Sequence, residues 1–256
     1  LNRGAISRFL QHSYVPTPHS VYSCFRKLPA GSSLTLAASN RLTSNTELPV
    51  VDVWWDAKSV AESSLASPFS DSRDEAVERL DEALTEAVRL RMLSDVPLGA
   101  FLSGGIDSSL VCAIMQKQSS RPIQTFTIGF EEAGYNEAGH AKLIAEHLGT
   151  DHTEYYVTPN EAREVIPRLP EMYDEPFSDS SQIPTFLVSQ LARQHVTVAL
   201  SGDGGDELFG GYNRYFHLRN RWRQVNRIPC RKIVSKMLSI PGKLSRGRWR
   251  DRFLYR

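Results

Sequence analysis

Hydrophobic positions in the middle of the chain follow first the period of a helix and then an alternation of strand-like and helix-like runs. Val77, Leu80, Leu84 and Val88 are three or four residues apart, which predicts a long helix over about residues 72–93. Short apolar runs predict strands at 98–102, 123–130, 153–157 and 196–200. Amphipathic segments predict helices at 106–117, 136–148, 159–166 and 184–195. This alternation predicts an α/β fold, a parallel sheet with helices on both faces.

The pattern also divides the chain into three zones. Residues 1–57 begin with a short amphipathic piece that contains Ile6, Phe9 and Leu10, and continue with prolines and short strand-like runs. Residues 58–72 are rich in serine and proline and are predicted to be a linker. Residues 73–256 hold the alternating strands and helices. We therefore expect the main domain to begin at the long helix.

Composition restricts the class of protein. With 41% hydrophobic and 23% charged residues over 256 positions, the sequence is typical of a soluble globular protein. No run approaches the 18 or so apolar residues of a membrane span, and no signal segment is evident. The cysteines, Cys24, Cys112 and Cys230, are far apart. That spacing argues against a disulfide framework or a zinc site and is consistent with a reducing cytoplasm.

The net charge of +1 conceals a strong asymmetry. Residues 214–256 contain 14 Lys and Arg but only one acidic residue, Asp251. A basic, tryptophan-containing segment of this kind is compatible with nucleic-acid binding. It is equally typical of helices with arginine-rich solvated faces, and we favour this interpretation because no nucleic-acid-binding motif accompanies the charge. A nucleic-acid partner is therefore not expected.

The stretch FLSGGIDSSL, residues 101–110, predicts a phosphate-binding loop between a strand and a helix. Gly104 and Gly105 allow close approach of the backbone to an anion, and Ser103 and Ser108 add hydroxyl donors. The lysine of the common nucleotide-binding loop is absent. Asp107 would repel phosphate unless a cation lies between them, so the loop predicts bound Mg²⁺.

A second glycine-rich loop, SGDGGDE at residues 201–207, follows the last predicted strand. Asp203, Asp206 and Glu207 lie within five residues there, and such carboxylates repel one another unless a cation is present. Acidic residues at the start of a helix explain Asp206 and Glu207 equally well. They do not explain the glycines around Asp203, so we interpret this loop as part of a site.

At these loops the sequence resembles a known superfamily. The motif S-G-G-I-D-S-S is similar to the PP-loop signature of ATP pyrophosphatases, which split ATP between the α- and β-phosphates. Within that superfamily, SGDGGDELFGGYNRY, YNEAGHAKLIAEHLGTDHTEYYV and YDEPFSDSSQIPTFLVS resemble glutamine-hydrolysing asparagine synthetases. The resemblance extends from about Pro16 to about Tyr215. A loop that holds the departing pyrophosphate needs no lysine at the γ-phosphate.

The resemblance implies an activity and assigns residues to it. ATP would adenylate the side-chain carboxylate of aspartate and release pyrophosphate, and ammonia would then form the amide and AMP. Asp107 and Asp206 are implied as Mg²⁺ ligands, and Asp203 as the acidic residue that handles protons in the ammonia step. The implied contacts to ATP and pyrophosphate are Leu102, Ser103, Gly104, Gly105, Asp107, Ser108, Ile128, Ser201 and Gly202.

The resemblance also implies a domain organisation and partners. Residues 1–57 would be the end of a glutaminase domain with its connecting segment, and 73–256 an ATP-binding domain that is C-terminally incomplete. The glutaminase domain of this family begins with a cysteine nucleophile, whereas position 1 here is Leu. The family's catalytic lysine would lie further downstream. We therefore expect a fragment that depends on a missing glutaminase domain for its ammonia. The expected location is the cytoplasm, and the oligomer considered is a homodimer.

Other activities stay open at this point. Residues 174–176 and 178–182 also resemble a bacterial branch that includes amidotransferases of surface polysaccharides. An RNA-thiolating PP-loop enzyme would suit the basic segment but usually needs reactive cysteines near the loops. Ligases related to GMP or NAD synthetase share the first loop but not S-G-D-G-G-D-E. A non-catalytic nucleotide-binding fragment is the remaining alternative.

Overall fold

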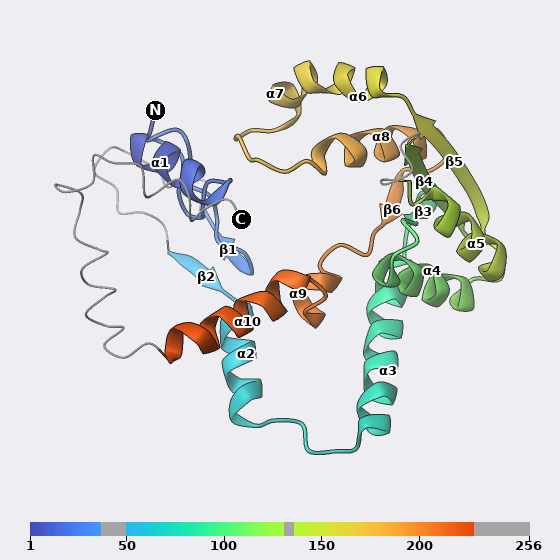
Figure 1. The fold of residues 1–256 in the computed structure, drawn as a ribbon, viewed down its shortest axis with the longest axis horizontal. Coiled ribbons are helices and arrows are strands. Elements are labelled where there is room, and N and C mark those ends of the chain that lie inside the picture. The colour runs from blue at the N-terminus through green and yellow to red at the C-terminus, as the bar shows by residue number, and fades with distance from the viewer. Residues whose placement is uncertain (37–49, 131–135, 228–256) are drawn as a thin grey trace. The chain divides into compact units, whose positions relative to one another are not determined.

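The computed structural model of the chain describes residues 1–36, 50–130 and 136–227 (Figure 1). These form two compact units, Leu1–Gly202 and Asp203–Arg256, which are treated separately below. The predicted basic segment beyond residue 227 lies outside the described residues. No described helix has the length and apolar character to cross a membrane.

The N-terminal part of the first unit contains two helices and a small sheet. Helix α1, Arg3–His12, confirms the predicted amphipathic piece, and the side chain of Asn2 caps it. Strands β1, Ser32–Leu34, and β2, Val51–Val53, pair antiparallel. Helix α2, Ala57–Ala66, occupies part of the predicted linker; Asp56 caps its first turn and all its residues are exposed. The whole first half of the Ser- and Pro-rich stretch, residues 58–72, is thus helical.

The second part of the first unit is built on a parallel sheet of four strands. These are β3, Leu98–Phe101; β4, Gln124–Phe130; β5, Asp151–Val157; and β6, Val198–Leu200. Their order is β5-β4-β3-β6 and every neighbouring pair is parallel. The predicted α/β fold with a parallel sheet is therefore confirmed.

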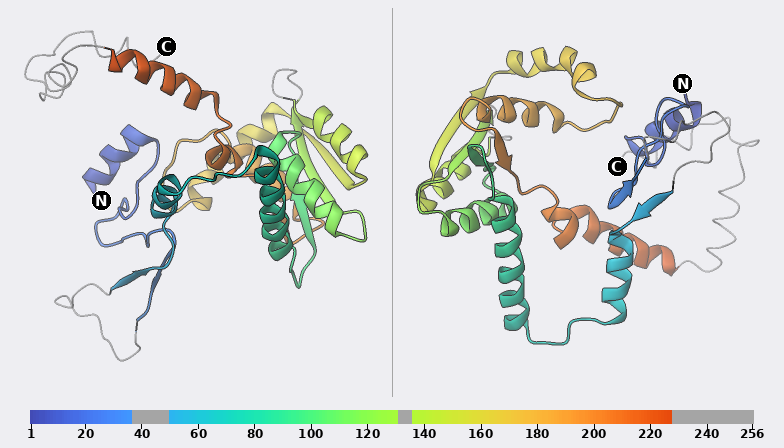
Figure 2. Two further views of the ribbon diagram at one scale, coloured as in Figure 1. Left: turned by 90° about the horizontal axis from the view of Figure 1, so that it is seen from below. Right: turned by 180° about the vertical axis from the view of Figure 1, so that it is seen from behind.

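Helices cover both faces of this sheet (Figures 1 and 2). Ala100 and Leu102 pack with buried side chains of α3 (Arg73–Arg91), α4 (Ile106–Gln118) and α5 (Ala138–Leu148). Phe101 faces the opposite way, toward α8 (Gln182–Ala192). Ile128 and Phe130 of β4 pack with α6 (Pro159–Val165), α7 (Leu169–Met172) and α8. A short 3₁₀ turn, Ile166–Arg168, joins α6 to α7. Alternate residues thus face opposite helical layers, as the period of a strand requires.

Local sequence signals set the helix ends. A capping box opens α3, in which Ser72 and Glu75 exchange side-chain hydrogen bonds with each other's main-chain amides. Thr158 and Glu161 form the same arrangement at α6, with Pro159 in the first turn. Gly149, at φ 69°, ends α5 in the left-handed conformation. These signals fix the beginnings of α3 and α6 and the end of α5, after which β5 begins at Asp151.

The second unit contains α9, Gly205–Phe209, and α10, Asn213–Asn226. Gly204 (φ 92°) precedes α9 and Gly210 (φ 70°) follows it, so glycine sets both ends of this single-turn helix. In α10, Arg214 stacks on Tyr212, with 4.0 Å between the guanidinium carbon and the ring centroid. The predicted helix after the second glycine-rich loop is thus confirmed.

Candidate functional site

The strand order creates a switch point beside β3. From β3 the chain proceeds outward to β4 and β5 and then returns to the other side of β3 as β6. Ala100 pairs with Leu200, so β3 and β6 end at the same level of the sheet. The loops that follow these two strands are the two glycine-rich loops. In open parallel sheets, ligands bind at such a crevice beyond the carboxyl ends of the strands.

The first loop is closed on itself by its serine hydroxyls. The oxygens of Ser103 and Ser108 are 2.9 Å apart, and the Ser103 amide donates to Ser108 Oγ at 3.2 Å. The Gly105 amide donates to Ser103 Oγ at 3.3 Å. Gly105 is also the cap residue of α4, and no side chain in the described part of the chain caps that helix end. The first-turn amides of α4 are therefore oriented toward the crevice and suit a phosphate oxygen.

Gly104 is held against the start of α5. It has φ 80°, and a Cβ there would lie 2.9 Å from the Ala141 amide nitrogen and 2.9 Å from His140 Cβ. Both the dihedral angle and the close approach require glycine. Helix α5 thus packs against the loop at Gly104.

Gly202, in the second glycine-rich loop, lies directly against the first loop. A Cβ at this position would lie 2.5 Å from the Ser108 amide nitrogen and 2.8 Å from the Asp107 carbonyl carbon. Both contacts are with main chain, which has little room to move. The structure therefore brings residues 201–202 together with residues 107–108, as expected for two halves of one cradle.

Leu102 and Ile128, two of the expected contacts to ATP, differ in their positions relative to the strand ends. Leu102 is 1% exposed and belongs to the core with α3, α4 and α5, so its side chain is buried. Ile128 is not at the end of β4, since Gly129 and Phe130 follow it within the strand. However, β4 pairs with β3 only as far as Phe126, so Ile128 extends beyond the end of its neighbour. Their contact with ATP stays a prediction.

The acidic residues of the second loop belong to the second unit. Asp206 lies against the Gly211 main chain, whose amide donates to the Asp206 carbonyl at 3.0 Å. The Tyr212 hydroxyl donates to Glu207 Oε1 at 2.8 Å. This hydrogen bond, with the nearby negative charge, raises the pKa of Tyr212. Glu207 therefore has a structural partner, whereas the roles of Asp203 and Asp206 stay predictions.

The described residues contain no cluster of three or more His, Cys, Asp or Glu side chains that could hold a metal ion. In the first unit, Asp107 alone contributes a carboxylate to the phosphate loop, and its side chain is partly exposed. Mg²⁺ in nucleotide sites usually takes one or two carboxylates, and phosphate oxygens and water complete its shell. The loop thus fits Mg²⁺ that arrives with a nucleotide and does not fit a metal centre made by protein alone.

Two further features lie away from these loops. A cavity of about 800 Å³ lies between α8 and the edge of β6, and none of the residues predicted for the site lines it. Cys112 is fully buried in the core, and burial raises the pKa of its thiol to about 12. An unreactive Cys112 beside the first loop argues against the thiolation chemistry considered above.

The sequence did not predict the contacts that hold residues 176–182 in place. The Gln182 side-chain amide donates to the Phe177 carbonyl at 3.0 Å and to the Asp179 carbonyl at 2.8 Å, which fixes the turn before α8. Glu175 pairs with Lys27, a residue 148 positions away. No local signal announces a contact over that separation.

The fold and the loops together define a class: an α/β protein with two glycine-rich loops at the switch point of a parallel sheet. The sequence model of the family described as Asparagine synthase matches residues 79–255. This match covers more than half of the chain, which therefore belongs to the asparagine synthase family. The resemblance inferred from the motifs is confirmed.

Individual relatives agree with this assignment. A Methanocaldococcus jannaschii protein, named as a candidate glutamine-hydrolysing asparagine synthetase, is 38% identical over 83% of this chain and 39% of its own length. Asparagine synthetase 1 of Bacillus subtilis, glutamine-hydrolysing by name, is 34% identical over 84% of this chain and 32% of its own length. The chain thus spans well under half of these curated relatives.

Among solved structures, the ammonia-dependent NAD synthetase of Campylobacter jejuni aligns with a TM-score of 0.37 and 13% identity, over 53% of this chain and 60% of that one. A TM-score this low supports no conclusion.

Proposed function

We propose that this chain is the ATP-using part of an enzyme that converts the side-chain carboxylate of aspartate to an amide, with AMP and pyrophosphate as products. The observation that carries the proposal is the close approach of Gly202 to the Ser108 amide in a lysine-free loop at the switch point. Membership of the asparagine synthase family supports the reaction type. Ammonia would come from glutamine through another domain of the polypeptide, in the cytoplasm.

The proposed reaction has two steps. A carboxylate oxygen of aspartate attacks the α-phosphorus of ATP, the bond between that phosphorus and the α,β-bridging oxygen breaks, and pyrophosphate leaves. Ammonia then attacks the acyl carbon, AMP leaves with the transferred oxygen, and one proton is released. The enzyme must therefore stabilise the charge that develops on the departing pyrophosphate, and contacts to the γ-phosphate alone would not do this.

The chain offers groups for each part of this reaction. The first-turn amides of α4, with the hydroxyls of Ser103 and Ser108, would bind pyrophosphate. Ser201 and Gly202 would contact ATP or the acyl-adenylate. Asp203 would handle the proton of the ammonia step.

Asp107 and Asp206 are the proposed ligands of Mg²⁺. When bound, Mg²⁺ would neutralise phosphate charge and allow a carboxylate to lie beside it. Asp107 follows Gly105 and Ile106 at the start of α4, so its position is set by the loop that receives the phosphates.

The test uses the polypeptide as its gene encodes it, with Mg²⁺, ammonium, ATP and aspartate labelled with heavy oxygen in its side-chain carboxylate. We expect AMP that carries one heavy oxygen, pyrophosphate and asparagine in equal amounts. Hydroxylamine in place of ammonium should give the hydroxamate of the same carboxylate. Formation of ADP and phosphate would contradict the proposal. AMP formation with a uronic-acid acceptor but not with aspartate would assign the chain to polysaccharide amidation instead.

A further inference from the structure

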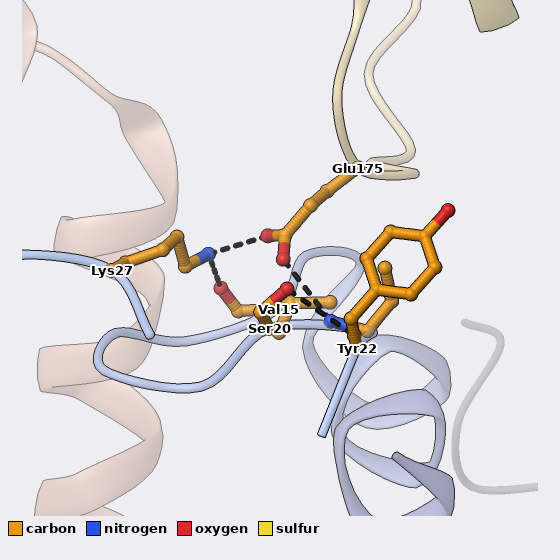
Figure 3. A network of polar contacts seen from close by, with 6 residues as sticks. Val15, Ser20, Tyr22, Lys27 and Glu175 are labelled. Carbon is orange, nitrogen blue, oxygen red and sulfur yellow. Dashed lines mark hydrogen bonds and ion pairs between the residues drawn. The ribbon is translucent and has the colours of Figure 1, made fainter. Parts of the chain in front are cut away.

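An ion pair joins the N-terminal part of the first unit to the segment before α8 (Figure 3). Lys27 Nζ lies 2.7 Å from Glu175 Oε2 and also donates to the Val15 carbonyl. The second carboxylate oxygen, Oε1, accepts from the Val21 amide at 3.1 Å. Both oxygens of Glu175 are therefore used, and both partners come from residues 15–27. We call Lys27 and Glu175, with the Val15 and Val21 main-chain groups that they bind, the latch.

The latch is partly shielded from water. The Glu175 side chain is 18% exposed and the Lys27 side chain 36% exposed. Burial works to raise the pKa of Glu175, but hydrogen bonds from Lys27, Ser20 and the Val21 amide outweigh it and keep that pKa below its ordinary value. An ion pair in this setting is worth more than one on the open surface, because solvent and salt screen it less.

A main-chain hydrogen bond continues the same junction. The Ser178 amide donates to the Ser13 carbonyl at 2.7 Å, where Ser13 leaves α1 with φ 68°. From Ser178 the chain runs through exposed Ser180 and Ser181 into Gln182, which begins α8. The stretch 175–182 is thus fixed at one end by the latch and at the other by the Gln182 hydrogen bonds described above.

The start of α8 lies at the carboxyl end of the sheet. Ile183 and Phe186, near its beginning, pack in one cluster with Ile128 and Phe130, at the far end of β4. Val188, Leu191 and Ala192, near its end, pack with Phe126. Helix α8 therefore runs antiparallel to β4, and residues 175–182 reach the edge of the sheet from which both glycine-rich loops emerge.

The phosphate loop and residues 175–182 are held in place by different contacts. The phosphate loop receives its support from α5 and from Gly202. Among the described contacts, none joins the latch to the phosphate loop. A hydroxyl-rich turn at the same edge, held independently of the phosphate loop, suits the other substrate, which carries a carboxylate and hydrogen-bonding groups.

We propose that the latch positions residues 176–182 for the carboxylate substrate, so that Lys27 and Glu175 act as positioning residues for acceptor binding and not for ATP binding. The inference rests on the proposed function. It places part of the acceptor specificity in residues 15–27, outside the 79–255 region matched by the family.

The test compares steady-state constants for the two substrates in the polypeptide as its gene encodes it. Glu175→Ala and Lys27→Met should each raise the KM for aspartate by roughly tenfold to a hundredfold, as expected for loss of a charged hydrogen bond. The KM for ATP should stay at its wild-type value. The double variant should be no worse than the more impaired single variant, because one interaction is lost in each case. Lys27→Arg should retain most of the wild-type affinity for aspartate.

Glu154→Ala provides the matched control, because Glu154 lies on β5, away from the latch, is 17% exposed and pairs with Lys142 of α5 at 3.1 Å. It should leave both KM values unchanged. Hydrogen exchange gives a readout that needs no activity: in Glu175→Ala, the Val21 and Ser178 amides should exchange faster, while residues 103–109 keep their wild-type rates.

Three outcomes would overturn the inference. Equal rises in both KM values would make the latch a general structural support. Faster exchange at Val21 and Ser178 with an unchanged KM for aspartate would remove its role in acceptor binding. A wild-type enzyme that forms no AMP would contradict the proposed function, and the latch inference would fall with it. The activity of the wild-type enzyme therefore distinguishes this failure from the other two.

Discussion

At the scale of single residues, the site depends on positions where a side chain is not tolerated. Gly104 and Gly202 approach main-chain atoms so closely that even a Cβ would lie under 3.0 Å from them. The purpose of such contacts is to leave the first-turn amides of α4 accessible while the two loops touch. The hydroxyls of Ser103 and Ser108 in the first loop lie within hydrogen-bonding distance of each other. We therefore expect affinity for phosphate to arise mainly from the backbone, which glycine leaves accessible.

Gly202→Ala should impair nucleotide binding. Its Cβ would lie 2.5 Å from the Ser108 nitrogen, and relief of that clash requires the loops to separate. We expect a loss of about 1–3 kcal/mol in the free energy of unfolding, which is typical of overpacking. The free energy of ATP binding should fall by more than the free energy of unfolding. Calorimetry with a non-hydrolysable ATP analogue and urea denaturation measure the two effects.

Gly139→Ala is the control for this substitution. Gly139 lies in α5, and a Cβ there would have no neighbour within 4 Å. Alanine should be neutral or stabilise the helix by no more than about 1 kcal/mol. Equal affinity for ATP in the Gly202→Ala and Gly139→Ala proteins would show that the close approach has no functional role.

The proposed Mg²⁺ ligands can be tested by removal of charge. Asp107→Asn and Asp206→Asn should each weaken Mg²⁺-dependent ATP binding by at least roughly tenfold, because the phosphates would lose a bridged carboxylate. Glu207→Gln should have a smaller effect, since the Glu207 carboxylate accepts a hydrogen bond from the Tyr212 hydroxyl. Titration of ATP with and without Mg²⁺ measures this, and unchanged Mg²⁺ dependence in both Asn variants would exclude the assignment.

At the scale of helices and strands, the sequence predicted what short-range patterns determine. The three- and four-residue spacing of the apolar positions from Val77 to Val88 predicted α3, and the apolar runs predicted all four strands of the parallel sheet. Helix α2 was missed because none of its residues is buried, so no apolar face marks it. The latch was missed for a different reason. Lys27 and Glu175 are 148 residues apart, and only the folded chain brings them together.

Strand β5 provides a prediction about pH. His152 Nδ1 lies 2.9 Å from Thr125 Oγ1, and its Nε2 is buried without a partner in the described residues. Burial lowers the pKa of His152, Glu154 works to raise it and Lys142 to lower it. The unfolded chain therefore binds a proton more readily than the folded one. The stability that His152 contributes is fully present above the ordinary value of 6.5 and is lost as the pH falls through the folded pKa.

The measurement is the free energy of unfolding from about pH 8 to about pH 5, with His152→Gln as the comparison. Wild-type stability should decline over the acidic part of this range, and the variant should decline less. Equal slopes in the two proteins would contradict this role for His152.

At the scale of the whole molecule, the charge and the division into units both change near the second glycine-rich loop. The boundary between the compact units falls between Gly202 and Asp203, inside the S-G-D-G-G-D-E motif. The excess of Lys and Arg begins a few residues later, at Arg214. The first unit contains the phosphate loop, its supports and the latch, whereas the second contributes the acidic residues. Because Asp206, a proposed Mg²⁺ ligand, belongs to the second unit, a test of ATP binding must use a chain that contains both units.

We expect these 256 residues, expressed on their own, to bind Mg²⁺–ATP. The α4 amides, the two serine hydroxyls and Gly202, which are the proposed phosphate contacts, all lie within the compact unit Leu1–Gly202. We do not expect glutamine-dependent turnover, because the chain spans only 39% and 32% of the lengths of two relatives named as glutamine-hydrolysing. Calorimetry should therefore detect saturable binding of a non-hydrolysable ATP analogue, weakened in Gly202→Ala, while assays with aspartate and glutamine release little AMP. Absence of binding would contradict the site, and rapid glutamine-dependent AMP release would contradict the separation of binding from turnover.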